Sequence, residues 1–208
     1  VITGASDGIG VEFCRVLAPR GWNLVLVARR EQKLRELASS LRAEHGAASE
    51  VIPCDLAEPH AAQALHRKTK DLGIEVDLLV NNAGLLHNGF FDAIDLAKQQ
   101  AMLAVNVLAL TSLAHLYLND MLARGRGRIL NLSSTAAGIG RLPAAGRRAC
   151  TAIGEGRCRT SRRIRARRSA PSGLHSGMAV KWNAGAIVTD FAAGTRLSKF
   201  EPFAVVSV

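Results

Sequence analysis

Hydrophobic positions along the chain form short continuous apolar runs, separated by longer segments in which apolar residues recur every three or four positions. Such runs are typical of strands buried on both faces, and the longer segments are typical of amphipathic helices. We predict five strands, at "VIT", "NLVLVA", "EVIPCD", "VDLLVNN" and "RGRGRILNLSS". Four helices are expected between them, over about 9–19, 31–45, 59–72 and 96–123.

This regular alternation predicts an α/β fold, because strand–helix–strand units build parallel sheets with right-handed crossovers. At 208 residues the chain fits one domain. We therefore expect a single Rossmann-type doubly wound parallel sheet over 1–208. The first strand is expected to be clipped to Val1–Thr3 and the last loop to be cut short near Val208, so that the fold is truncated at both ends.

The helical pattern fails after the fifth strand. Between Arg147 and Arg168 the only large aliphatic residues are Ile153 and Ile164, which cannot form an apolar helix face. We expect residues 144–176 to be irregular and mobile, because so few apolar groups cannot offset the entropy of ordering the chain. Beyond them, "GMAVKW" predicts a short strand and "NAGAIVTDF" a loop at a strand end.

The net charge of +10 is confined to one part of the chain. Residues 144–182 carry +9 and the remainder only +1. A basic arm that binds nucleic acid is one interpretation of this interval. It contains neither Phe nor Tyr, and its one aromatic residue is the terminal Trp182, so stacking on bases is poorly supported. Nucleic-acid binding is therefore the less favoured function.

Composition argues against several other classes of protein. The four cysteines and six histidines lack the spacing of a zinc site or of a disulfide framework, so we expect no metal. No apolar run approaches the roughly 18 to 20 residues of a membrane helix, and the first residues lack a signal pattern. These observations predict a cytoplasmic protein without a membrane segment.

Polar and glycine-rich motifs follow the predicted strands. "TGASDGIG" (Thr3–Gly10) lies between the first strand and a helix, "ARR" (28–30) ends the second strand, and "CDL" (54–56) ends the third. "NNAG" (81–84) and "NLSS" (131–134) end the fourth and fifth. Parallel strands bring their carboxyl ends to one edge, which is where open α/β sheets bind ligands. The glycine turn would let the backbone and a helix N-terminus approach a pyrophosphate.

These motifs, in this order, resemble the classical type of the short-chain dehydrogenase/reductase family, and the resemblance covers 1–143 and 184–195. It implies an NAD(P)-dependent oxidoreductase that transfers a hydride between the cofactor and a small-molecule carbonyl or alcohol. It also implies a homo-oligomer.

The same resemblance implies roles for individual residues. Ser134, with Ser133 as the alternative, would bind the substrate oxygen, and Asn106 in "VNV" would hold a helix kink and a water. The implied cofactor contacts are Gly4, Ser6, Asp7, Gly8, Ile9 and Gly10 at the pyrophosphate, Arg29 and Arg30 at the end of the second strand, Asp55 and Leu56 at the adenine, Asn82, Ala83 and Gly84 along the riboses, and Ile187 and Thr189 at the carboxamide and pyrophosphate.

The resemblance breaks at the catalytic Tyr-x-x-x-Lys segment. Arg147 and Thr151 occupy the positions where it implies Tyr and Lys, and the only tyrosine, Tyr117, is followed by Met121 four residues later. An Arg-, Ala-, Gly- and Ser-rich interval of nearly preserved length is typical of out-of-frame translation of a GC-rich gene, with a genuine basic insertion as the alternative. We therefore expect impaired catalysis. A non-catalytic dinucleotide-binding protein is the alternative function.

Cofactor choice is predicted by the end of the second strand. An acidic residue there binds the ribose 2′-hydroxyl of NAD(H), and a basic residue accommodates the 2′-phosphate of NADP(H). The strand ends in Ala28, Arg29 and Arg30, and no carboxylate follows before Glu31. NADP(H) is thus the expected cofactor, with NAD(H) possible.

Overall fold

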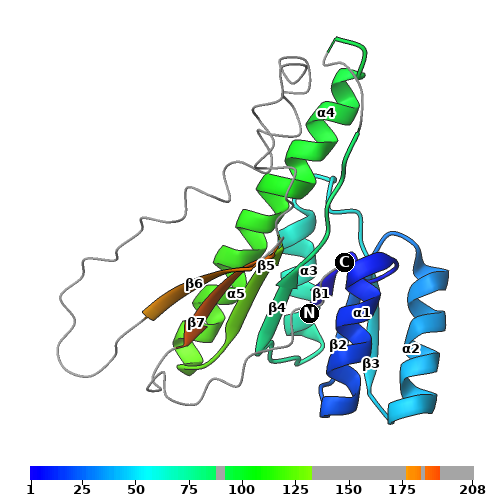
Figure 1. Cartoon of the computed structure of the whole chain (residues 1–208), viewed down its shortest axis with the longest axis vertical. Coiled ribbons are helices and arrows are strands. Elements are labelled where there is room, and N and C mark those ends of the chain that lie inside the picture. Colours follow the sequence, from blue (N-terminus) through cyan, green and yellow to red (C-terminus); the bar gives the residue numbers. More distant parts are fainter. Residues whose placement is uncertain (88–91, 133–176, 184–185, 193–208) are drawn as a thin grey trace.

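The computed structural model describes residues 1–87, 92–132, 177–183 and 186–192 (Figure 1). The first four strands alternate with three helices: β1 (Ile2–Thr3), α1 (Gly8–Leu17), η1 (Ala18–Arg20), β2 (Leu24–Ala28), α2 (Glu31–His45), β3 (Ser49–Pro53), α3 (Ala61–Asp71) and β4 (Leu78–Asn81). A long helical segment and three strands follow: α4 (Leu96–Leu103), the π-helical η2 (Ala104–Ala109), α5 (Leu110–Arg124), β5 (Arg128–Leu132), β6 (Gly177–Asn183) and β7 (Ala186–Ala192).

All of these strands belong to one sheet, in the order β3-β2-β1-β4-β5-β7-β6. The first five pair in parallel, and the crossovers reverse direction between β1 and β4. In Figure 1, α2 and β3 lie at one end of the sheet and β6 at the other. This arrangement confirms the predicted Rossmann-type α/β fold with a doubly wound parallel sheet.

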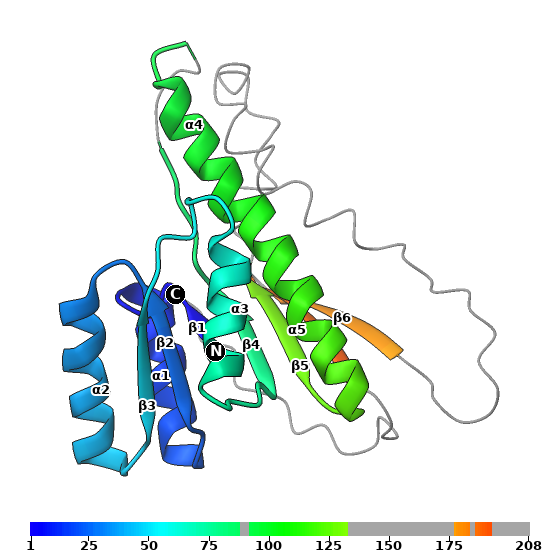
Figure 2. The same cartoon turned by 180° about the vertical axis from the view of Figure 1, so that it is seen from behind.

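Two apolar cores cover the two faces of the sheet. Figures 1 and 2 show the sheet and its helices from opposite sides. Successive residues of β2 point to opposite faces, so Leu24 and Leu26 pack under α1 and α2, whereas Val25 and Val27 pack under α3 and α5. Both sets are buried, which explains why the sequence of β2 is apolar without interruption.

The last two strands differ from the sequence expectation. Residues 186–192 were expected to form a loop, but they form β7, which pairs antiparallel with both β5 and β6. The β-branched residues Ile187, Val188 and Thr189 favour an extended backbone, and a partner strand at 177–183 completes a hairpin. The strand predicted at "GMAVKW" is confirmed.

The helical stretch Leu96–Arg124 is by length and composition long and apolar enough to cross a membrane, with 29 residues and a mean hydropathy of 1.7 over an 18-residue window. Its interruptions are mostly uncharged, as at Asn106, so the expectation that no segment would reach this length was wrong. A mostly buried core helix passes the same test; here 28% of the most apolar window is buried, with Leu113 and Met121 packed in the core that covers one face of the sheet. One such helix is weak evidence of a membrane span, and the cytoplasmic location stays a prediction.

Candidate functional site

Thr3 joins the glycine turn to the end of β4. Its Oγ1 accepts hydrogen bonds from the backbone N–H groups of Asn82 and Ala83, both at 3.0 Å, and donates to the carbonyl of Val80 at 3.2 Å. The Asn82 side-chain amide donates in return to the carbonyls of Thr3 at 2.9 Å and Gly4 at 3.3 Å. Thr3 is only 1% exposed, so these bonds form in a buried setting. Sequence reasoning missed Thr3, although a lone hydroxyl ending an apolar strand was a usable signal.

Gly4 and Gly10 of the turn must be glycine, because neighbouring atoms lie where a Cβ would be. Gly4 has φ +68°, and an added Cβ would lie 2.8 Å from Asn82 Nδ2. At Gly10 an added Cβ would lie 2.2 Å from the carbonyl oxygen of Gly4, so any side chain there would push α1 off the turn. At Gly8, which has φ +51°, a Cβ would meet nothing within 4 Å. The turn is thus packed on its inner side and open at Gly8.

Cys14 fixes the first turns of α1 against this region. Its thiol is buried and donates to the carbonyl of Gly10 at 3.1 Å. Burial raises the pKa of Cys14 to about 12, so the thiol stays protonated at neutral pH. It therefore acts as a small apolar group with one donor, and it offers no thiolate for chemistry.

The two arginines after β2 have different surroundings. Arg30 Nη2 donates to Ser6 Oγ at 3.1 Å and to Asp7 Oδ2 at 3.0 Å, so it lies over the glycine turn. Arg29 instead lies 3.8 Å from Asp55 at the end of β3. The sequence pattern assigns both arginines to the cofactor site without distinguishing them. Of the two, Arg30 contacts the glycine turn and Arg29 contacts Asp55.

Asp7 caps the start of α1. Its Oδ1 accepts from the backbone N–H of Gly8 at 3.0 Å, while its Oδ2 faces Arg30 and lies 3.9 Å from Lys33 Nζ. The hydrogen bond from Arg30, with that from Gly8 and the charge of Lys33, holds the pKa of Asp7 below its ordinary value. The carboxylate is exposed and stays ionised at neutral pH.

The loop after β3 contributes one partly buried and one buried residue. Asp55 Oδ1 accepts from the backbone N–H of Ala57 at 3.0 Å, which shapes the loop. The side chain of Leu56 is only 8% exposed and belongs to the core under α3, so a ligand at this edge would meet its backbone.

The π-helical segment brings Asn106 to the loop that follows "NNAG". Its Oδ1 accepts from the backbone N–H of Leu85 and its Nδ2 donates to the carbonyl of Leu85, each at 2.9 Å. Oδ1 also lies near Gly84, 3.8 Å from the position of an added Cβ. The expected kink is thus a π-helical turn, and the side-chain amide of Asn106 is fully engaged with Leu85.

The remaining predicted residues lie near or beyond the end of β5. Asn81 Nδ2 donates to Asn131 Oδ1 at 2.8 Å across β4 and β5. Ser133, Ser134, Arg147 and Thr151 follow this pair and lie outside the described residues. Ile187 pairs with Asn131 in the sheet, and Thr189 pairs with Val180, so both lie on a strand. The sheet thus brings Ile187 beside the end of β5.

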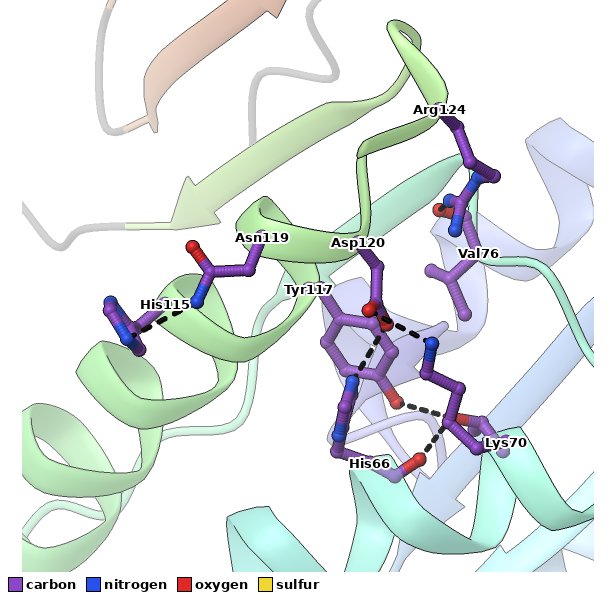
Figure 3. A network of polar contacts seen from close by, with 9 residues as sticks. His66, Lys70, Val76, His115, Tyr117, Asn119, Asp120 and Arg124 are labelled. Atoms are coloured by element: carbon purple, nitrogen blue, oxygen red, sulfur yellow. Dashed lines mark hydrogen bonds and ion pairs between the residues drawn. The ribbon is translucent and has the colours of Figure 1, made fainter. Parts of the chain in front are cut away.

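Tyr117 lies in a separate polar network between α3 and α5 (Figure 3). Its hydroxyl shares a hydrogen bond of 3.0 Å with Thr69, and its ring meets His66 edge-on at 5.1 Å. Burial raises the pKa of Tyr117 to about 12. Nearby, Asp120 accepts from His66 at 2.7 Å and pairs with Lys70 at 2.9 Å.

An open pocket of about 390 Å³ borders this network, lined among others by Lys70, Val76, Tyr117 and Asp120. Val76 precedes β4, which places the pocket toward the amino ends of the strands, away from the glycine turn. Tyr117 is therefore buried between α3 and α5 and lies away from the glycine turn. Within 1–87 and 92–132, His, Cys, Asp and Glu form no group that could hold a metal.

Comparison with known proteins decides the family. The family model for short chain dehydrogenase matches residues 1–146. This chain belongs to the short-chain dehydrogenase family. Ketoacyl reductase HetN from a Nostoc species is 37% identical over 136 residues, which are 65% of this chain and 47% of that protein. The 7beta-hydroxysteroid dehydrogenase of Clostridium sardiniense is 36% identical over 135 residues, covering 64% of this chain and 51% of that protein.

Solved structures of short-chain dehydrogenases share the fold. A short-chain dehydrogenase from Sphingobium yanoikuyae in complex with NADPH matches with a TM-score of 0.68 and 31% identity, over 74% of this chain and 59% of that one. The chain spans about half the length of the curated relatives it matches. Its relatives in the short-chain dehydrogenase family are oxidoreductases, so the family is one of enzymes.

Proposed function

We propose that this chain binds NADP(H) at the carboxyl edge of its sheet and derives from an oxidoreductase acting on a small carbonyl or alcohol, with catalysis impaired in this chain. The observation that carries the proposal is the glycine turn. Its inner side is closed by Thr3, Asn82 and the approach of α1 at Gly10, while its outer side at Gly8 is open. A turn of this kind at a helix N-terminus suits a pyrophosphate.

The residues around the turn fit a phosphorylated dinucleotide. Gly4, Ser6, Gly8, Ile9 and Gly10 would hold the pyrophosphate, and Ile9 is 47% exposed beside it. Arg30, with Lys33 close by, supplies positive charge at the place where a 2′-phosphate would need it. Asn82, Ala83 and Gly84 would border the riboses. The bound cofactor would supply the hydride, and the protein would supply position and electrostatics.

The pocket for the substrate is the part that we propose to be defective. Ser134 would bind the substrate oxygen, and Asn106 would position the loop at Leu85 through its two hydrogen bonds. The proton donor is missing, since Arg147 has a guanidinium that stays charged and Tyr117 is buried elsewhere. Loss of general acid catalysis alone would lower turnover by about 10² to 10⁴.

The same observations favour a non-catalytic dinucleotide-binding protein as the second candidate. The described cofactor half keeps the contacts of Thr3, Asn82 and Asn106, whereas the only tyrosine in the sequence is committed to Thr69. Both candidates bind NADP(H), and they differ in whether turnover remains.

Calorimetric titration of the chain with NADPH and NADH, followed by an assay of NADPH oxidation with a panel of aldehydes and ketones, tests the proposal. We expect NADPH to bind more tightly than NADH and turnover to stay below about 1 s⁻¹, the low end of ordinary enzymes. Gly10→Ala should lose binding. Gly21→Ala is the control for a general loss of stability: its φ of +78° disfavours any side chain although an added Cβ meets nothing within 4 Å, so this variant should be less stable and keep binding. Absence of dinucleotide binding would overturn the proposal. Faster turnover would overturn its catalytic part.

A homo-oligomer is proposed from the helical segment α4–α5. Leu108 is 65% exposed and Leu122 is 48% exposed there, although the opposite side of the segment is buried. Exposed leucines on one helical segment favour contact with a second copy. Sedimentation of the chain would show whether it self-associates, and a Leu108→Glu variant should then be monomeric.

A further inference from the structure

Asp7 occupies an unusual place among the groups expected to bind the cofactor. It is the acidic residue of the glycine turn, and two cations converge on one of its oxygens. Arg30 Nη2 donates to Asp7 Oδ2 at 3.0 Å, and Lys33 Nζ lies 3.9 Å from the same atom. Arg30 Nη2 also donates to Ser6 Oγ at 3.1 Å.

We propose that Asp7 is an internal competitor of the 2′-phosphate, so that this carboxylate sets how strongly the chain prefers NADP(H) over NAD(H). The inference rests on the proposed binding of a dinucleotide at this edge. Arg30 and Lys33 both lie at the turn, and Asp7 Oδ2 is the acceptor that they share. A phosphate that used these cations would have to share or displace that oxygen.

The charges support competition rather than cooperation. A phosphate monoester carries about −1.5 to −2 at neutral pH, so an ionised carboxylate beside it is repelled. The pKa of Asp7 is held below its ordinary value, mainly by the hydrogen bond from Arg30, so the carboxylate is charged wherever the phosphate is. A 2′-hydroxyl carries no charge and meets no such repulsion. Asp7 therefore reduces the difference in binding affinity between NADP(H) and NAD(H).

The second oxygen of Asp7 has a different role, which determines how the proposal is tested. Oδ1 caps α1 by accepting from the backbone N–H of Gly8 at 3.0 Å. Asn and Ser are equally good caps, so Asp7→Asn and Asp7→Ser remove the charge and keep the helix start. Glu12 lies exposed on the same helix and pairs with Arg15 at 2.8 Å. Glu12→Gln removes the same charge away from Arg30 and serves as the control.

The experiment titrates the full chain calorimetrically with adenosine 2′,5′-bisphosphate and with adenosine 5′-monophosphate, which differ in the 2′-phosphate. We expect Asp7→Asn and Asp7→Ser to bind the bisphosphate about two- to fivefold more tightly than the original chain, the range for an exposed ion pair. Binding of the monophosphate should change less than binding of the bisphosphate, so that the ratio of the two affinities rises in both Asp7 variants, and Glu12→Gln should bind both probes like the original chain.

Three results would overturn the proposal. Unchanged binding of the bisphosphate in both Asp7 variants would show that the carboxylate does not compete. Weaker binding would show that Asp7 instead holds Arg30 in place for the phosphate. An equal gain in Glu12→Gln would make the effect one of net charge. If the original chain binds neither probe, the proposed cofactor site itself is wrong. This outcome differs from the other three, in which the original chain binds the bisphosphate.

Discussion

Asn106 and Leu85 are joined by two hydrogen bonds of 2.9 Å that run in opposite directions between one side-chain amide and one backbone unit. The π-helical segment η2 presents this amide to the loop, and the loop follows directly on "NNAG" at the end of β4. The helix thus fixes the path of the chain at the edge where the candidate site lies.

Replacement of Asn106 should loosen that loop. In Asn106→Ala the N–H and carbonyl of Leu85 lose their partners, which should cost about 1 to 3 kcal/mol of unfolding free energy. Asn106→Asp keeps the acceptor but faces the Leu85 carbonyl with a negative charge, so it should not rescue. Urea denaturation measures both. Asn119→Ala is the control, because Asn119 bonds only an exposed histidine, His115. Equal stability of the Asn106→Ala and Asn119→Ala variants would contradict this role.

Thr3 should tolerate Ser but not Val. Thr3→Val takes the Oγ1 acceptor from the Ala83 N–H and leaves the Asn82 N–H with only the Val80 carbonyl at 3.1 Å, with a cost of about 1 to 3 kcal/mol, whereas Thr3→Ser retains the hydroxyl. NADPH affinity should fall in Thr3→Val along with stability, since the glycine turn would lose its attachment to β4. Denaturation and calorimetry of the two variants check this. An unchanged Thr3→Val variant, or a larger loss in Thr3→Ser than in Thr3→Val, would show that the methyl group matters and the hydroxyl does not.

Arg30 should govern NADPH affinity more than Arg29. Arg30 contacts the turn at Ser6 and Asp7, whereas Arg29 lies nearest Asp55. Removing one exposed charge from a phosphate site is expected to weaken NADPH binding by about two- to fivefold in Arg30→Gln and to leave NADH binding unchanged. Arg29→Gln is the matched variant. A larger loss of NADPH binding in Arg29→Gln would reverse the assignment.

Asp120 should make the fold sensitive to acid. Burial alone would raise its pKa, but hydrogen bonds from Lys70 and His66 outweigh burial and hold the pKa below the ordinary 3.8. A carboxylate with a lowered pKa stabilises the fold above its unfolded-state value, and this contribution is lost as the pH falls from about 3.8 through the folded pKa.

Asp120→Asn should therefore be less stable than the original chain at neutral pH, by about 1 to 3 kcal/mol, and the difference should shrink below about pH 4. Denaturant titrations across that range measure it. Asp71→Asn removes the same charge from the exposed end of α3 and should show no such convergence. A constant difference between Asp120→Asn and the original chain at every pH would refute the linkage.

Sequence reasoning reached the sheet because β2 and β4 are apolar runs, β3 and β5 have shorter apolar stretches at Val51–Ile52 and Ile129–Leu130, and the helices between them are periodic. It placed the motifs at one edge of the sheet for the same reason, since parallel strands end together, and binding of a ligand at that edge stays a prediction. It could not separate Arg29 from Arg30, because adjacent residues after a strand point in different directions that only the packing of α2 and the glycine turn decides.

Two other misses have local causes. Residues 186–192 were taken as a loop because "NAGAIVTDF" resembles a family loop, although Ile187, Val188 and Thr189 carry strand propensity. Thr3 was passed over because its chemistry lies in contacts with Asn82 and Ala83, about eighty residues away in the chain. The expectations for Ser134, Arg147 and Thr151 lie outside the described residues and stay predictions.

The reactivity of the buried Cys14 thiol reports how often the glycine turn opens. A thiol that is fully covered and donates to the carbonyl of Gly10 reacts with an alkylating reagent only when α1 lifts from the sheet. The rate of Cys14 alkylation therefore measures how often the turn that would hold the pyrophosphate opens. Mass spectrometry of the peptide that contains Cys14 follows this rate. Any ligand that holds this turn closed should lower the rate of Cys14 alkylation, whether or not the protein converts it to a product.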